Sequence, residues 1–157
     1  MTIRLRQATH EDARFLFELR NEPSVRAASF SSEAILFPDH ERWLKEKLKD
    51  KNSPLWIAEL DGQPIGQVRF DVVSKEEAEI NIAIQCASRG KGYGTEVVRR
   101  ASRDFFDTFQ NINTLRAHIK PDNRASVKTF QKSGYRIKSE TDIKGIHSLS
   151  LVLNRYL

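Results

Sequence analysis

The amino-acid sequence predicts a single α/β domain over residues 1–157, in which helices flank a mixed β-sheet. Three observations carry this prediction. Apolar residues alternate with polar ones in several short segments, which is typical of strands, and recur every three or four residues in others, which is typical of helices. The two kinds of segment follow one another without a repeat, a low-complexity tract or a linker. A chain of 157 residues suits one hydrophobic core and is too short for two full-sized domains.

The spacing of apolar residues, together with capping and turn signals, assigns each element in order. Thr9 and Asp12 form a capping signal for the first helix, and Asn21-Glu22-Pro23 ends it. The expected elements are strand 3–8, helix 10–20, helix 39–49, a hairpin of strands 55–60 and 64–73, strand 79–84, helix 94–109, strand 115–119, helix 124–133 and a hairpin of strands 135–139 and 146–153. Segment 24–37 is expected to be irregular or a short helix, and 74–78 a charged loop.

Composition narrows the class of protein. No apolar run approaches the roughly 20 residues that a membrane-spanning helix needs, and the N-terminus lacks the apolar stretch of a secretory signal, so we expect a cytoplasmic protein without membrane contact. The one cysteine, Cys86, excludes an internal disulfide framework and the cysteine-rich zinc sites. The four histidines lack the spacing of metal ligands, so we expect no metal.

The positive charge is concentrated in one stretch of the chain. Residues 89–138 hold 12 lysines and arginines against 4 acidic residues, whereas residues 1–88 hold 12 against 15 and have a net charge of −3. The basic stretch predicts an anionic partner: nucleic acid, acidic lipid or a phosphorylated small molecule. No recognition helix and no pattern of interleaved aromatic residues supports nucleic acid, so we favour the small molecule.

A glycine-rich turn between strand 79–84 and helix 94–109 is the most informative motif, and it reads Arg89-Gly-Lys-Gly-Tyr-Gly94. Its glycines let backbone N–H groups point into one cavity, the helix N-terminus adds positive potential, and Arg89 and Lys91 add charge, so the turn can bind a pyrophosphate. The P-loop pattern is absent, and the pattern G-x-G-x-x-G fails because residue 95 is threonine. The alternative is a flexible turn that only feeds the helix.

These residues resemble the GNAT N-acetyltransferase superfamily. Its acetyl-CoA signature, Q/R-x-x-G-x-G/A after the central strand, is met by Arg89, Gly92 and Gly94. A second family feature, an asparagine after the next strand and a helix ending in K-x-G-F/Y, is met by Asn123 and by residues 132–135. Both motifs occur at the family's separation, and the order of elements matches along nearly the whole chain. The resemblance therefore implies a GNAT-like, mostly antiparallel sheet flanked by helices.

The resemblance also implies the reaction, which is direct attack of a primary amine on the thioester of acetyl-CoA. In such enzymes the exposed edge of the central strand pairs with the pantetheine arm, the glycine turn binds the pyrophosphate, and the asparagine binds the arm. Carried over residue by residue, the cofactor-binding residues are Ile82, Ala83, Ile84, Arg89, Gly90, Lys91, Gly92, Tyr93, Gly94, Thr95, Asn123 and Lys128.

The attacking amine must first lose a proton. Some family members place the base at the start of the central strand, where this chain has Glu79; the alternative is a solvated residue beside the acidic loop. The family's general acid, a tyrosine, is replaced by Phe130, which cannot donate a proton, so the proton must come from water, the substrate or another residue. Cys86 lies beside the turn but lacks a base partner, which argues against a covalent nucleophile.

The acceptor site is expected in the N-terminal half. The pattern N-x-P-x-V-R at 21–26 and the pattern H-x-x-W at His40 and Trp43 resemble the GNAT branch that acetylates amino-sugar nucleotides for nonulosonic acids. By that resemblance Arg26 and His40 contact a UDP-amino-sugar; the alternative is a Trp43 core anchor with Arg26 and His40 on the surface. The net charge of −3 over residues 1–88 does not favour an anionic acceptor.

Other functions stay open. Within the same class, the acceptor is a protein N-terminus or another small amine. In a different class, the domain binds CoA without turnover, for which Phe130 is the best argument, or binds nucleic acid through its basic stretch. The sequence also leaves open whether the chain forms a homodimer.

Overall fold

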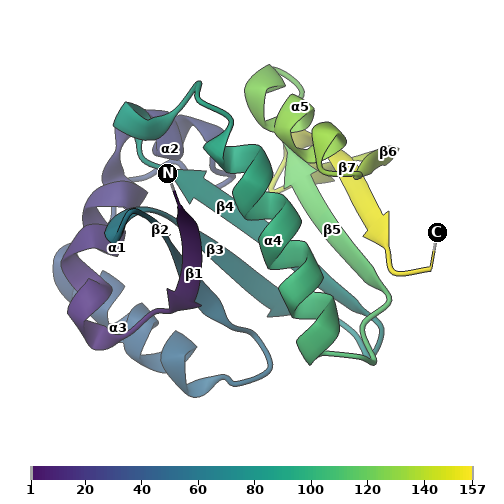
Figure 1. The fold of residues 1–157 in the computed structure, drawn as a ribbon. Coiled ribbons are helices and arrows are strands. Elements are labelled where there is room, and N and C mark those ends of the chain that lie inside the picture. Colours follow the sequence, from purple (N-terminus) through teal and green to yellow (C-terminus); the bar gives the residue numbers. More distant parts are fainter. Residues whose placement is uncertain (1, 157) are drawn as a thin grey trace.

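The seven strands of the computed structural model, which describes residues 2–156, form one sheet in the order β1-β2-β3-β4-β5-β7-β6 (Figure 1). The strands are β1 (Ile3–Gln7), β2 (Leu55–Leu60), β3 (Gln63–Val72), β4 (Glu77–Ile84), β5 (Thr114–Ile119), β6 (Arg136–Ile143) and β7 (Ile146–Asn154). The helices are α1 (Ala13–Asn21), α2 (Pro23–Ala28), α3 (Phe37–Lys49), α4 (Tyr93–Thr108) and α5 (Arg124–Lys132), with short 3-10 helices η1 (His10–Asp12) and η2 (Cys86–Ser88). Within the described residues, no helix is long and apolar enough to cross a bilayer.

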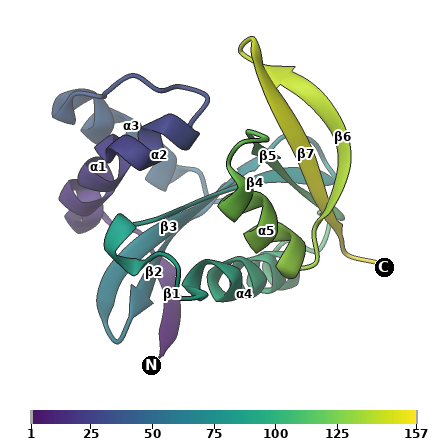
Figure 2. The ribbon, with the colours of Figure 1, turned by 90° about the horizontal axis from the view of Figure 1, so that it is seen from above.

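The helices cover both faces of the sheet. Figure 2 shows α1, α2 and α3 on one side of it and α4 and α5 on the other. Neighbouring strands are antiparallel except for β4 and β5, which run parallel because the crossover between them passes through α4. The predicted α/β class, with a mixed and mostly antiparallel sheet, is confirmed.

The main core lies between the sheet and α4. Because side chains alternate along a strand, the apolar residues of β3, β4 and β5 face α4 and the residues between them face the other side. Val97, Val98, Ala101 and Phe105 of α4 are fully buried, and the Phe105 ring stacks on the Phe70 ring with centroids 4.2 Å apart. The buried side of α4 is therefore the side on which its apolar residues recur every three or four positions.

The first helix begins at the predicted capping signal. Thr9 and Asp12 form a capping box, in which the Asp12 carboxylate accepts from the Thr9 amide at 2.8 Å. Asp12 also accepts two hydrogen bonds of 2.8 Å from the Arg6 guanidinium of β1. Burial alone would raise the pKa of Asp12, but the bonds from Arg6 and Thr9 outweigh it, so this pKa lies below its usual range. The Arg6–Asp12 pair thus ties the start of α1 to the edge of the sheet.

Some boundaries differ from the predictions. Segment 24–37 contains most of α2, which starts at Pro23 because a proline ring suits the first turn of a helix. β4 starts at Glu77 rather than at residue 79, because the carbonyl of Glu77 already accepts hydrogen bonds from the amides of Val73 and Ser74, directly after β3. The last hairpin is longer than expected, with β6 reaching Ile143. The other ends agree with the predictions to within about two residues.

β4 and β5 pair over a short length only. Their register covers three pairs, from Glu77↔Thr114 to Glu79↔Arg116, although β4 continues to Ile84. On its other edge β4 pairs with β3 as far as Ile84. Beyond Glu79 the two parallel strands separate, so the second half of β4 presents one edge to the space between them.

Gly66 of β3 allows β3 and β4 to approach closely beside this free edge. A Cβ atom at residue 66 would lie 2.4 Å from the Ala83 carbonyl oxygen and 2.7 Å from Ile84 Cδ1. We expect Gly66→Ala to lower the free energy of unfolding by about 1–3 kcal/mol, measured by thermal unfolding of the free protein. Gly94→Ala is the control, because its Cβ would meet Thr129 at an ordinary 3.5 Å. Equal melting temperatures for G66A and the wild type would contradict the predicted clash.

Candidate functional site

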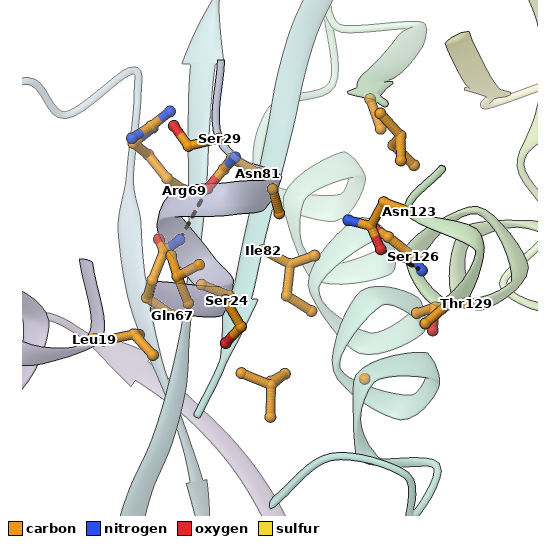
Figure 3. Close-up of a pocket in the computed structure, with 18 of the residues that line it drawn as sticks. Leu19, Ser24, Ser29, Gln67, Arg69, Asn81, Ile82, Asn123, Ser126 and Thr129 are labelled. Atoms are coloured by element: carbon orange, nitrogen blue, oxygen red, sulfur yellow. Dashed lines mark hydrogen bonds between the residues drawn. The ribbon is translucent and has the colours of Figure 1, made fainter. Parts of the chain in front are cut away.

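One large cavity opens where β4 and β5 separate. Its volume is about 790 Å³, and it is lined by strands β2 to β5, by α1, α2 and α3, and by the glycine turn, the start of α4 and α5. Figure 3 shows Asn123 and Ser126 on one side, Arg69 and Ser29 on the other, and Ile82 of β4 between them. We call these the α4–α5 side (the glycine turn and α5) and the α1–α2 side (α1, α2 and the part of β3 and β4 that faces them).

The glycine turn forms a wall of the α4–α5 side. Gly90 and Gly92 have φ values of +75° and +82°, in the left-handed region that glycine adopts most easily. Gly92 is the N-cap of α4 and, as a glycine, has no side chain that could cap that end of the helix. The first N–H groups of a helix have no partner within it, and the helix dipole adds positive potential there. The turn therefore offers backbone donors to an anion.

The two basic side chains of the turn lie in different places. Arg89 lines the cavity, but its guanidinium donates to the Ile84 carbonyl at 2.9 Å and to Ser24 Oγ at 2.7 Å. Lys91 is exposed and does not line the cavity. The Arg89 side chain thus joins the turn to α2, and the donors that the turn presents to the cavity come from its backbone.

The other residues predicted to bind the cofactor lie on the same side. Ile82, Ala83 and Ile84 belong to the part of β4 that pairs with β3 but not with β5, and all three line the cavity. Asn123 is the N-cap of α5, where its Oδ1 accepts from the Ser126 amide at 3.3 Å, and Figure 3 shows it reaching into the cavity. Apart from the lysine of the turn, every residue predicted to bind the cofactor lines the cavity, Lys128 included. Their roles in binding stay predictions.

Polar side chains of β3 and β4 form the floor of the α1–α2 side. Gln67 and Asn81 are joined by a hydrogen bond of 2.9 Å from Gln67 Nε2 to Asn81 Oδ1 (Figure 3). Arg69 Nε donates to Asp71 Oδ2 at 3.0 Å, and the Arg69 guanidinium lies 5.9 Å from the centre of the Trp43 ring. These contacts hold a positive charge at the floor of the cavity.

Arg20 and His40 line the wall above this floor. Arg20 Nη2 donates to the Ser31 carbonyl at 2.9 Å, whereas Arg20 Nη1 is buried without a partner. Burial, together with the charges of Arg69 and Arg26, lowers the pKa of Arg20. His40 is buried, its Nδ1 has no partner, and burial and the Arg20 charge lower its pKa. Each of these side chains therefore has a buried nitrogen atom without the hydrogen bond that would compensate for its loss of water.

No aspartate or glutamate lines the cavity within residues 2–156, although residues 1–88 are net acidic. The carboxylates nearby have other partners. Asp71 accepts from Lys47 and Arg69, and Glu22 accepts from the Cys86 amide at 3.1 Å. The net charge of residues 1–88 therefore does not describe this cavity, because the acidic residues of that region point elsewhere, and the charge of the acceptor stays a prediction.

The segment that matches N-x-P-x-V-R holds α2 in place. Asn21 exchanges two hydrogen bonds of 3.0 Å with the backbone of Ile35, which fixes the loop after α2. Glu22 and Ser24 both accept hydrogen bonds from residues 86–89. This segment therefore connects the wall of the α1–α2 side to the glycine turn.

Of the two predicted acceptor contacts, His40 lines the cavity and Arg26 does not. Arg26 Nε instead donates to the Ser32 carbonyl at 3.0 Å. His40 is 3% exposed and Trp43 is 38% exposed, so the alternative that placed Trp43 in the core and His40 on the surface is wrong. The arginines that do line this side are Arg20 and Arg69.

Glu79 and His118 meet where the strands separate. Both face away from α4, because the residues that flank them in β4 and β5 are buried against that helix. Glu79 Oε1 lies 3.4 Å from His118 Nε2, and His118 Nδ1 is buried without a partner. His118 lines the cavity, whereas Glu79 does not. The His118 imidazole therefore lies between the Glu79 carboxylate and the cavity.

Phe130 lines the cavity at the position of the family's tyrosine. Tyr135 packs against it edge to face, with ring centroids 5.0 Å apart, but its hydroxyl bonds to Ser102 Oγ at 2.7 Å within the core. Burial raises the pKa of Tyr135 above its usual range. Tyr135 is thus not a substitute general acid. Cys86 is exposed and does not line the cavity.

Sequence reasoning missed Arg20, Arg69 and His118. A signal existed for His118, because it alternates with the buried Ala117 and Ile119 and so had to face away from the core. Only the sheet register and the packing of α1 bring the two arginines to one cavity. Over the described residues, no group of histidine, cysteine and carboxylate side chains is placed to hold a metal ion.

A family model described as an acetyltransferase (GNAT) domain matches residues 2–136. Among curated relatives, "Acetyltransferase PseH" of Campylobacter jejuni is 25% identical over 130 residues, which cover 83% of this chain and 80% of the relative. "Spermidine N(1)-acetyltransferase" of Escherichia coli is 24% identical over 141 residues, which cover 88% of this chain and 75% of the relative.

Solved structures share the fold. AAC(6')-Ib in complex with ribostamycin and coenzyme A has a TM-score of 0.87 at 20% identity, covering 99% of this chain and 94% of that one. Spermidine N-acetyltransferase from Vibrio cholerae, in complex with CoA and spermine, has a TM-score of 0.84 at 19% identity, covering 98% and 95%. The family model spans most of the chain, and the glycine turn lines the cavity. The chain belongs to the GNAT acetyltransferase family and is an acetyl-CoA-dependent N-acetyltransferase.

Proposed function

We propose that the chain acetylates an amine on a UDP-amino-sugar. The observation that carries this proposal is the α1–α2 side of the cavity, which holds Arg20 and Arg69 and, among residues 2–156, no carboxylate. A nucleotide-sugar carries a diphosphate, and the planar guanidinium group matches phosphate geometry. The resemblance of residues 21–26, and of His40 and Trp43, to the branch that acts on amino-sugar nucleotides supports the same acceptor.

The two sides of the cavity hold the two substrates in this proposal. Acetyl-CoA lies on the α4–α5 side, with its pyrophosphate on the amides of residues 90–95 and its pantetheine arm along the free edge of β4 at 82–84. Asn123 binds the arm, and Lys128 is available to the nucleotide phosphates. The fit rests on the left-handed glycines, the open helix N-terminus and the unpaired strand edge.

The amine attacks from the α1–α2 side. Its nitrogen forms a bond to the thioester carbonyl carbon, a backbone amide of β4 stabilises the oxyanion, and the C–S bond then breaks. CoA leaves as a thiolate and takes a proton from water or from the substrate, since Phe130 has none to donate. The products are the acetylated amine and free CoA.

We propose that Glu79 and His118 take the proton of the amine as a pair. His118 lines the cavity, and the Glu79 carboxylate lies 3.4 Å from its Nε2. A carboxylate next to an imidazole orients the ring and stabilises the imidazolium that forms when the ring accepts a proton. In this arrangement Glu79, the candidate from the sequence, is a positioning residue that acts through His118.

The alternatives are a protein N-terminus or another small amine as acceptor, and a domain that binds CoA without turnover. Nucleic acid is less well supported than the charge count implied. Several cations of the basic stretch already bind other groups of the protein. Arg99 donates to the Lys132 carbonyl, Arg116 donates to the Glu77 carboxylate, and Lys120 donates to the Ala27 carbonyl.

We place the reaction in the cytoplasm, because a chain with one cysteine needs no oxidising compartment.

The release of free CoA thiol from acetyl-CoA measures turnover with a panel of amines. We expect a UDP-linked 4-amino-sugar to give a kcat/KM about 100-fold or more above that of spermidine or of a peptide with a free N-terminus. Equal or faster turnover of the peptide or of spermidine would reject the proposed acceptor. Binding of acetyl-CoA without turnover of any amine would favour the alternative of a domain that binds CoA without catalysis.

Gly92→Val should abolish acetyl-CoA binding, because a β-branched residue is strained at φ +82° and the turn would lose its aligned amides. Gly62→Val in the β2–β3 turn is the matched control, since Gly62 has φ +85° and both sites are open around an added Cβ. Each variant should lose about 1–2 kcal/mol of stability. Only Gly92→Val should lose the rise in melting temperature that acetyl-CoA produces. An equal rise in both variants would disprove the role of the turn.

His118→Gln should lower kcat by about 100-fold or more while the KM for acetyl-CoA stays unchanged, because the base and not the cofactor site is removed. The acidic limb of the pH–kcat profile should disappear in this variant, and Glu79→Gln should lower kcat by a smaller factor. His147→Gln is the control, since His147 contacts Glu140 at 2.9 Å on the β6–β7 hairpin, outside the cavity lining. A wild-type kcat and pH profile in His118→Gln would rule out this base.

A further inference from the structure

Arg20 is a cation with an unfilled donor at the cavity wall. Its Nη2 donates to the Ser31 carbonyl, and its Nη1 has no acceptor. Within the described part of the chain, no carboxylate forms an ion pair with it. A buried donor without an acceptor, and a charge without a counter-charge, are both unfavourable in a folded protein. Arg20 therefore has an unmet requirement for an anionic acceptor of hydrogen bonds.

Arg69 adds a second guanidinium at the floor of the same side. It is close enough for its charge to depress the pKa of Arg20. Its Nε is held by Asp71, but that carboxylate also accepts from Lys47 Nζ at 2.7 Å, so one anion serves two cations. The net charge of this group of side chains is therefore positive before any ligand binds.

We propose that Arg20 and Arg69 bind an anionic group of the acceptor, a phosphate or a carboxylate, while its amine lies near Asn81 and His118. This inference rests on the proposed function in placing the acceptor on the α1–α2 side, and it assigns the contact to arginines outside the N-x-P-x-V-R pattern. The anion would give Arg20 the partner that it lacks and relieve the repulsion between the two guanidinium groups.

The same arrangement selects against cationic acceptors. A polyamine that enters the α1–α2 side meets two guanidinium groups and no carboxylate lining residue, within residues 2–156. Juxtaposed like charges in a partly desolvated cavity are unfavourable, so the site discriminates by repulsion as well as by attraction. The substrate class is therefore an amine that carries a negative charge elsewhere in the molecule.

Calorimetric titration of the full-length protein, saturated with CoA so that the α4–α5 side is occupied, tests the inference with UDP as the probe. We expect UDP to bind the wild type and to bind R20Q and R69Q about 10-fold to 100-fold more weakly. R20K keeps the positive charge but loses the planar guanidinium group, so its affinity for UDP should lie between those of the wild type and R20Q. R42Q is the control, because Arg42 is an exposed residue of α3 paired with Asp39. Melting temperature and CoA affinity report whether each variant is folded.

The outcomes separate this inference from the proposed function. Equal UDP affinity in the wild type, R20Q and R69Q overturns the inference, even if a UDP-amino-sugar is acetylated. Binding of glutamate that depends on Arg20, without binding of UDP, supports the anion site and rejects the nucleotide-sugar. Binding of neither anion, or binding of spermidine as tight as that of an anion, overturns the inference.

Discussion

The separation of β4 from β5 is the constraint on which the rest of this structure depends. The two strands pair only from Glu77↔Thr114 to Glu79↔Arg116, where the Arg116 guanidinium donates to the Glu77 carboxylate at 2.9 and 3.1 Å. Continued pairing to Ile84 would satisfy the strand edge and fill the space between the strands. Because the strands part instead, a cavity of about 790 Å³ reaches both faces of the sheet, and one substrate can meet another through it.

The two sides of this cavity are mechanically connected. α2 is fastened to the glycine-turn region through Glu22 and Ser24, and to the end of β5 through Lys120, which donates to the Ala27 carbonyl at 2.7 Å. Lys144, at the tip of the β6–β7 hairpin, reaches the loop after α2 at Ser31. The wall of the α1–α2 side is therefore fastened to the elements that shape the α4–α5 side. In the proposed function, this connection holds the two substrates in a constant position relative to each other.

Local signals in the sequence were enough to predict much of the fold and one side of the site. The capping box at Thr9 and the glycine turn each act within a few residues, and the left-handed φ values at residues 90 and 92 are ones that glycine adopts most easily. Arg20, Arg69 and His118 could not be predicted in the same way. They come from α1, β3 and β5, and only the register of the sheet and the packing of a helix upon it bring them to one cavity. For the same reason, the net charge of a segment did not predict which charges line the cavity.

Hydrogen exchange of individual backbone amides, with and without acetyl-CoA, tests most directly whether β4 keeps an edge open for the cofactor. The account predicts that the amides of residues 82–84 that point away from β3 exchange rapidly in the free protein, and that acetyl-CoA slows them by about 10-fold or more as they gain acceptors. The amides of β4 that bond to β3 should change little and serve as the internal reference. Slow exchange of the free-edge amides without ligand, or no change on adding saturating acetyl-CoA, would contradict this account.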